Sequence, residues 1–199
     1  LDFEQRVQQW MQDHLPASMQ AKGSGSILIF AHLTDKNIKG MLSGSILGLV
    51  LISMILVFAL RSIKVGVLSL VPNLVPVIIG FGLWGLFYVE VNMALAAVVS
   101  MTLGIVVDDT VHFLSKYLRA KREKGYSTEE SITYAFTHVG KALTISTLIL
   151  SAGFGVLMLS PFALNSDMAT LTTWIIMIAL VVDLLLLPIL LLKLDKEKT

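Results

Sequence analysis

The chain has 199 residues, of which 55% are hydrophobic and 15% charged, and its mean hydropathy is +0.80. This composition excludes an ordinary soluble domain and predicts an integral membrane protein. The formal net charge of +1 and the lack of a basic stripe with interleaved aromatic residues argue against a nucleic-acid partner. The chain has no cysteine, which excludes disulfides and thiolate metal sites, and we expect neither a metal ion nor a cofactor.

Residues 1–37 are more polar than the rest and are expected to form the end of an extracytoplasmic domain. Apolar residues at helical spacing predict an amphipathic helix within residues 1–22: Phe3, Val7, Trp10, Met11 and Leu15. The short, partly β-branched run ILIFAHL at 27–33 predicts a strand. It follows GSGS at 23–26, which fits either a natural turn or an engineered linker. We therefore expect a small α+β remnant here, without a signal peptide, in a piece of a longer protein.

Five long apolar stretches follow, and a membrane-spanning helix needs about 20 apolar residues. They cover residues 41–60, 65–87, 91–113, 142–160 and 168–192. Residues 38–192 are therefore predicted to form a five-helix transmembrane domain, followed by a cytoplasmic tail at 193–199. Pro72 and Pro76 predict a kink in the second span, and Asn73 is expected to help repair the broken backbone hydrogen bonds.

The orientation is predicted from the basic residues between the spans. The connections after the second and fourth spans have no Lys or Arg, whereas those after the first, third and fifth are basic. This pattern places the basic connections and the C-terminus in the cytoplasm and residues 1–38 outside. In the third connection, Ser127 and Glu130 form a capping-box pattern that predicts an amphipathic helix over about 127–139 on the inner membrane surface.

Three acidic residues, Asp108, Asp109 and Asp183, lie within predicted spans. A carboxylate in the membrane costs at least about 2.5–3.5 kcal/mol, so such residues usually face a protein interior and mark function. A rise of about 1.5 Å per residue places Asp108 roughly 8 Å and Asp183 about 5 Å to the cytoplasmic side of their span centres. Thr144 and Thr147 lie roughly 6–10 Å to the same side. Polar groups of three spans are thus predicted to share one layer.

Helical spacing groups these residues further. A stripe with a spacing of four residues runs along the third span, through Ser100, Gly104, Asp108 and His112. Asp109 lies about 100° around the helix from Asp108. Thr144 and Thr147 share one face of the fourth span, and we expect that face to meet the stripe across an interface, with Gly104 permitting a close approach.

Adjacent carboxylates suggest proton transfer, because burial and a neighbouring like charge both favour the protonated form of an acid. We therefore predict a proton relay of Asp108 and Asp109, with contributions from Thr144, Thr147, Asp183 and His112. Alternative interpretations remain for the individual residues. Asp109 also fits a residue at the helix end that is satisfied by water or by Lys116, and Asp183 fits a structural hydrogen-bond partner. Thr144 and Thr147 fit residues that hold two helices together, and His112 fits an interfacial residue with no role in proton transfer.

Four segments together resemble a known family: RSIKVGVLSLVPNLVPVIIGFGLWG, GIVVDDTVHFLSKYLRAKREKG, ALTISTLILSAGFGVLMLS and ALVVDLLLLPILL. Over about residues 27–198 the chain resembles one half of a resistance-nodulation-division (RND) superfamily exporter. The most similar branch is that of bacterial predicted exporters related to the mycobacterial membrane protein large (MMPL) and hopanoid-transporter groups. The resemblance maps the family's relay acids onto Asp108 and Asp109.

The resemblance implies an architecture of twelve spans in two halves, each with a first helix, a porter domain and five further helices. The chain would then be the end of a porter domain plus the last five spans of the C-terminal half, an α-helical membrane unit similar to a sterol-sensing domain. Helix movements would reach the porter domain through residues 27–41.

The predicted function is proton-motive-force-driven export of hydrophobic or amphiphilic, lipid-like molecules across the bacterial inner membrane. The protein would be a secondary active transporter and not an enzyme. Its expected partners are membrane lipids, the other half of the transporter and the lipid-like substrate, and a homo-oligomer remains open. The alternatives are a sterol-sensing-like lipid-binding or scaffold module without transport, and a SecD/SecF-like accessory of protein export.

Overall fold

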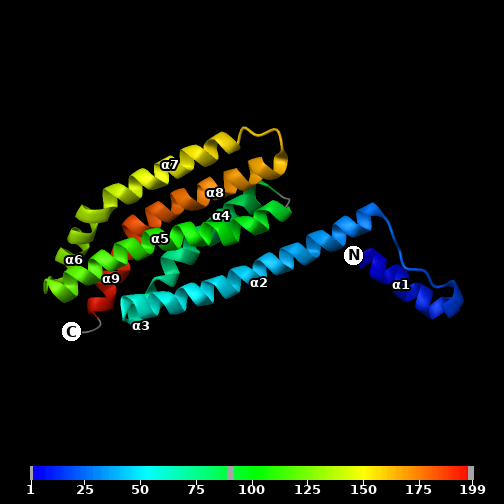
Figure 1. Ribbon diagram of the computed structural model, residues 1–199, viewed down its shortest axis with the longest axis horizontal. Coiled ribbons are helices and arrows are strands. Elements are labelled where there is room, and N and C mark those ends of the chain that lie inside the picture. Colours follow the sequence, from blue (N-terminus) through cyan, green and yellow to red (C-terminus); the bar gives the residue numbers. More distant parts are fainter. Residues whose placement is uncertain (1, 89–91, 197–199) are drawn as a thin grey trace.

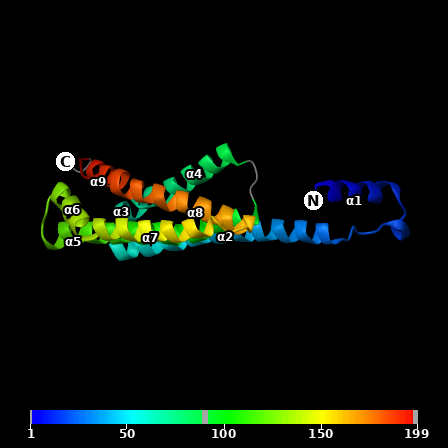
Figure 2. The ribbon, with the colours of Figure 1, turned by 90° about the horizontal axis from the view of Figure 1, so that it is seen from above.

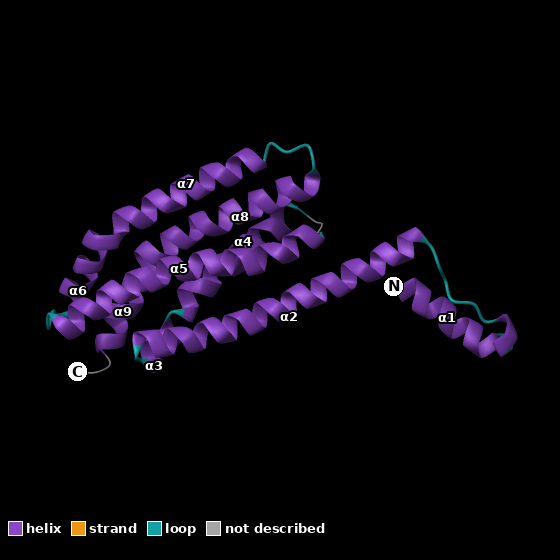
Figure 3. Ribbon diagram, in the orientation of Figure 1, coloured by secondary structure: helices purple, strands orange, loops and turns teal. Residues whose placement is uncertain are grey.

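The computed structural model describes residues 2–88 and 92–196, and nearly all of these residues are helical, with no strand among them (Figure 1, Figure 3). Five helical segments are long and apolar enough to cross a membrane. They are Ser26–Phe58, Ile63–Phe87, Met93–Glu123, Thr128–Leu157 and Ala163–Leu194. The prediction of five spans is therefore confirmed, with the first, third and fourth helices extending further than the apolar stretches alone indicate.

The N-terminal helix α1 (Asp2–His14) lies apart from the bundle, beside the far end of the next helix (Figure 1). A helix was predicted in this stretch, and none of its residues is buried. A short 3₁₀ turn, η1 (Ala17–Met19), follows it. A 2.8 Å hydrogen bond between Glu4 and His32 connects α1 to the next helix.

The prediction of a strand at 27–33, and with it the α+β remnant, is wrong. These residues form the first two turns of α2 (Ser26–Leu60), a continuous helix of 35 residues that extends well beyond the bundle (Figure 1). A strand needs a neighbouring strand to pair its backbone groups, whereas a helix pairs them within itself. A seven-residue apolar run does not distinguish the two by periodicity. Helical pairs such as Lys39 with Asp35, at 2.7 Å, then continue the helix toward the first span.

The second span is broken, as its prolines predicted. It consists of α3 (Ile63–Leu68) and α4 (Leu70–Phe87), which meet at Ser69. Pro72 has no N–H to donate to the carbonyl of Leu68, and its ring crowds that carbonyl, so the helix is interrupted directly after Leu68. Pro76 removes a second donor one turn later.

The remaining helices form the bundle. Helix α5 (Met93–Glu123) packs against α2, α4 and α8 (Ala163–Val181), and α8 also packs against α4 and α7 (Lys141–Leu157) (Figure 2). Helix α8 continues through a π-helical segment, η3 (Val182–Leu186), into α9 (Leu187–Lys196). Most of these helices thus present one side to the bundle and another to its surroundings.

The predicted helix between the third and fourth spans is present as α6 (Thr128–Ala135). Its capping box is confirmed, because the Ser127 side chain accepts from the backbone of Glu130 and the Glu130 side chain accepts from the backbone of Ser127. A π-helical segment, η2 (Phe136–Gly140), joins α6 to α7 without a break. The connection and the fourth span therefore form one bent helical unit.

The connections lie at two opposite ends of the bundle (Figure 1). The α2–α3 and α5–α6 connections and the C-terminal helix lie at one end, which carries Arg61, Arg122 and Lys124 and is called the basic end below. The C-terminal end of α4, the N-terminal end of α5 and the α7–α8 connection lie at the other end.

A close helix contact at Gly80 predicts a stability effect. A Cβ atom at Gly80 would overlap the side chain of Ile175 on α8, whereas one at Gly82 would meet nothing within 4 Å. We expect Gly80→Ala to lower the free energy of unfolding by about 1–3 kcal/mol through overpacking. Gly82→Ala, the matched control, is expected to leave it unchanged or slightly raised. Thermal unfolding followed by circular dichroism in detergent micelles compares the two, and equal melting temperatures would contradict the close contact.

Candidate functional site

A buried polar cluster lies where α4, α5 and η3 meet. Its centre is Thr110 of α5, whose Oγ1 lies 2.8 Å from Oδ1 of Asn73 on α4 and 3.0 Å from Oδ1 of Asp183 in η3. The exposed fractions are 0% for Asn73, 0% for Thr110 and 1% for Asp183. Three spans thus place an amide, a hydroxyl and a carboxyl group in contact inside an apolar bundle.

Irregular helix geometry accompanies two of these residues. Asn73 lies one turn after the break at Ser69, between Pro72 and Pro76. Asp183 lies in the π-helical segment η3, and such segments inside long helices are frequent at functional sites. Two atoms of the cluster, Nδ2 of Asn73 and Oδ2 of Asp183, are buried without a hydrogen-bond partner. A buried polar group without a partner is costly, so the arrangement indicates a role other than stability.

Asp109 extends the cluster toward α7. Its side chain is half-buried, interacts with the Thr147 side chain, and is close enough to Asp183 for their charges to influence each other. Thr147 is 2% exposed, so this contact lies inside the protein. Groups from three spans thus interact inside the bundle, with Asp109 in the place where the sequence predicted Asp108.

Asp108 points away from this cluster. Its side chain is 71% exposed and lies 3.5 Å from the His112 ring, which is 60% exposed. Gly104 on the same face has nothing within 4 Å of a Cβ position. The predicted interface between this stripe and α7 is therefore wrong, because Asp109, about 100° away, is the residue that faces Thr147. At its far end the stripe contacts α2 through a 2.7 Å hydrogen bond between Ser100 and Ser45.

Thr144 does not join the cluster directly. Its hydroxyl donates to the carbonyl of Gly140 on the same helix, at 2.9 Å. Within the described part of the chain, no group of three His, Asp or Glu residues is arranged to hold a metal ion.

Thr110 was missed by the sequence analysis, and Asn73 was given another role. The motif DDT places Thr110 beside the two aspartates, but an isolated threonine in a span is common and usually bonds to its own helix, as Thr110 also does to the carbonyl of Val106 at 3.2 Å. The sequence did contain a signal for Asn73, because its amide lies between two prolines. A polar side chain at such a helix break can reach a neighbouring span.

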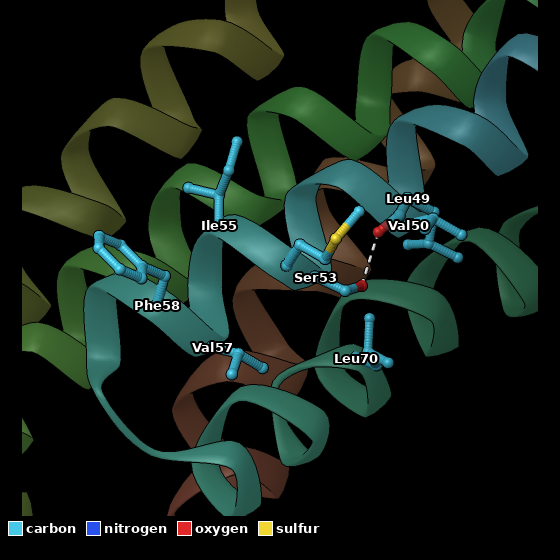
Figure 4. Close-up of a pocket in the computed structure, with 8 residues that line it drawn as sticks. Leu49, Val50, Ser53, Ile55, Val57, Phe58 and Leu70 are labelled. Atoms are coloured by element: carbon cyan, nitrogen blue, oxygen red, sulfur yellow. Dashed lines mark hydrogen bonds between the residues drawn. The ribbon is translucent and has the colours of Figure 1, made fainter.

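A separate apolar groove lies between α2 and the start of α4 (Figure 4). Its volume is about 890 Å³, and it is lined by Leu49, Val50, Ser53, Met54, Ile55, Val57, Phe58 and Leu70. The Ser53 hydroxyl is occupied by a 2.6 Å hydrogen bond to the carbonyl of Leu49. The groove therefore offers hydrocarbon contacts and almost no polar ones.

Comparison with known proteins gives a family match and a distant relative. The model of the MMPL family matches residues 4–196. The chain is also 30% identical over 141 residues to "Putative membrane protein MJ1562" of Methanocaldococcus jannaschii. That match covers 71% of this chain and 36% of the relative, so the chain spans little more than a third of the relative's length.

Proposed function

The chain belongs to the MMPL family, and on this premise we propose that it works in a transporter that uses the proton motive force to export hydrophobic or amphiphilic molecules. Family membership indicates an RND-like, lipid-related transporter and not an enzyme. The basic end of the bundle would lie in the cytoplasm, and α1 outside a bacterial inner membrane.

This proposal rests on one observation, namely that two carboxyl groups lie close to each other within the helical bundle. Asp109, Thr147 and Asp183 lie together between α5, α7 and η3, where a group that binds and releases protons can change how these helices pack. Asp109 would take up protons from the more exposed side, and Asp183 would hold them deeper in the bundle.

Asp108 and His112 would belong to the same pathway from the other side of α5. A face with these two polar side chains is costly against lipid hydrocarbon, so it needs a polar cover. We propose that the other half of the transporter covers it, and that Asp108 completes the relay at that interface.

A second function, lipid binding without transport, gains support from the apolar groove in Figure 4. A hydrocarbon chain fits a groove lined by aliphatic side chains and Phe58, as in a sterol-sensing-like module. Such a module does not require the carboxyl groups inside the bundle. The two functions therefore differ in their dependence on protons.

Reconstitution of the intact protein in proteoliposomes tests the proposal. A fluorescent lipid-like substrate is followed after a pH gradient is imposed, with and without a protonophore. We expect the gradient to drive substrate movement and the protonophore to stop it. Substrate binding that persists while the gradient drives no movement would favour the lipid-binding module and contradict the proposal.

A further inference from the structure

The hydrogen bonds of Thr110 impose a condition on its neighbours. A hydroxyl group has one hydrogen to donate and two lone pairs to accept with. Three acceptor atoms lie within reach of Thr110 Oγ1: Oδ1 of Asn73, Oδ1 of Asp183 and the carbonyl oxygen of Val106. Only one of these three atoms can accept the hydrogen of the Thr110 hydroxyl. Another neighbouring group can bond to this hydroxyl only by donating a hydrogen to its oxygen.

The two side chains can become donors in different ways. Asp183 donates only when its carboxyl group is protonated. Asn73 donates when its amide turns by half a rotation, which exchanges Oδ1 with Nδ2, an atom that has no partner in the present orientation. The carbonyl of Val106 cannot donate.

We propose that Thr110 couples the protonation of Asp183 to the orientation of the Asn73 amide. When Asp183 is charged, it accepts the Thr110 hydrogen, and Asn73 must present its NH₂ group to the hydroxyl. When Asp183 is protonated, it donates to Thr110, and Asn73 is free to present its oxygen, as it does in the structure. Asn73 and Thr110 are thus positioning residues for the proton on Asp183, a role that rests on the proposed proton-driven function.

In the proposed step a proton moves from Asp183 to Asp109, and no other reactant is needed. The O–H bond of Asp183 breaks, its hydrogen passes as a proton to the carboxylate of Asp109, and Asp183 keeps the negative charge. Asp109 is the charged group that acts on Asp183 from α5. Helix α4 presents the neutral Asn73, α8 has one charged residue, Asp167, about four turns away, and α9 has Lys193 about three turns away.

The amide rotation acts at a weak point of the second span. Asn73 lies between Pro72 and Pro76, whose missing N–H groups leave the carbonyls of Leu68 and Pro72 without their usual helical donors. An amide that turns its NH₂ group toward or away from Thr110 changes which polar atom faces this segment. The proton state of Asp183 can therefore alter the bend between α3 and α4 without any large rearrangement of the buried core.

Isotope-edited infrared difference spectroscopy tests this coupling in the intact protein in lipid vesicles. The protein is labelled with ¹³C,¹⁵N-asparagine, spectra are recorded at acidic and alkaline pH, and the Asn73 bands are assigned by their loss in Asn73→Gln. We expect these bands to change with pH in the wild type and in Thr110→Ser, which keeps the hydroxyl. We expect complete loss of the change in Asp183→Leu, which removes the titratable group without adding a labelled amide, and in Thr110→Val. Asn37→Gln, at an exposed asparagine, is expected to leave the difference spectrum unaltered.

Asn73 bands that stay constant in the wild type, or that still change in Asp183→Leu, would overturn the inference. If Thr110→Val fails to fold, the comparison of wild type, Thr110→Ser and Asp183→Leu still decides. The infrared experiment tests the coupling of Asn73 to Asp183, and the transport experiment tests the proposed function. Coupled bands without proton-driven movement in proteoliposomes would refute the proposed function alone, and proton-driven movement with constant bands would refute this inference alone.

Discussion

Replacement of Asp109 by asparagine is expected to abolish proton-driven export. Asp109 lies on the α5 face that meets Thr147 and approaches Asp183, so it is the carboxyl group that connects the buried cluster to the exposed side. Asparagine keeps the size of the side chain but neither binds nor releases a proton near neutral pH. In proteoliposomes with an imposed pH gradient, substrate movement should fall to the level seen with a protonophore.

The matched control for this variant is Asp35→Asn. Asp35 lies on the projecting part of α2 and pairs with Lys39 in an exposed ion pair, an interaction that contributes little. We expect wild-type transport from Asp35→Asn at equal protein content per vesicle. Undiminished proton-dependent transport by Asp109→Asn would show that the relay does not pass through this residue.

Removal of the Thr147 hydroxyl is the second large effect we expect. Valine at this position keeps the shape of the side chain and removes the polar partner of Asp109 inside the bundle. A hydrogen bond to a charged group contributes about 1.5–3 kcal/mol, which corresponds to roughly a 10- to 100-fold change in an equilibrium or a rate. The initial rate of gradient-driven transport should therefore fall by about tenfold or more in Thr147→Val.

Thr144→Val provides the comparison on the same helix. Thr144 bonds to the carbonyl of Gly140, and loss of this local bond should alter the rate by less than about twofold. Thr144→Val is expected to keep the wild-type melting temperature, whereas Thr147→Val should lower it by several degrees, so transport is compared at equal amounts of folded protein per vesicle. Equal losses of transport in the two variants would contradict a specific role of Thr147.

The spans were predictable because lipid imposes a simple rule. Every backbone group inside the membrane must be paired, so a long apolar stretch can only become a helix. The break in the second span was also predictable, because each of its two prolines lacks the N–H group that a helix needs for backbone pairing. Outside the spans this rule no longer applies, and residues 27–33 show the result. Their composition favours a strand, but the continuous α2 helix needs no partner strand.

The position of a polar residue along its helix follows from the sequence, but its rotation about the helix axis does not. A rise per residue fixes the height of Asp108 and Asp109 in the bundle. Which of the two faces the interior depends on how α5 packs against α2 and α8, and a single sequence does not contain that information. Thr110 was missed for the same reason, because its role comes from Asn73 and Asp183, which lie 37 and 73 residues away in the chain.

The length of α2 has a mechanical consequence. A helix of 35 residues is about 52 Å long, and in the described chain it runs without interruption from the bundle to the contact with α1. A rigid helix acts as a lever: Ser45, where α2 bonds to α5, is about 28 Å from the start of the helix at Ser26, so a tilt of about 5° there displaces that end by roughly 2.5 Å. Small changes in packing near Ser45 and Ser100, where α2 bonds to α5, would thus become displacements of a few ångströms at the end of α2 that contacts α1.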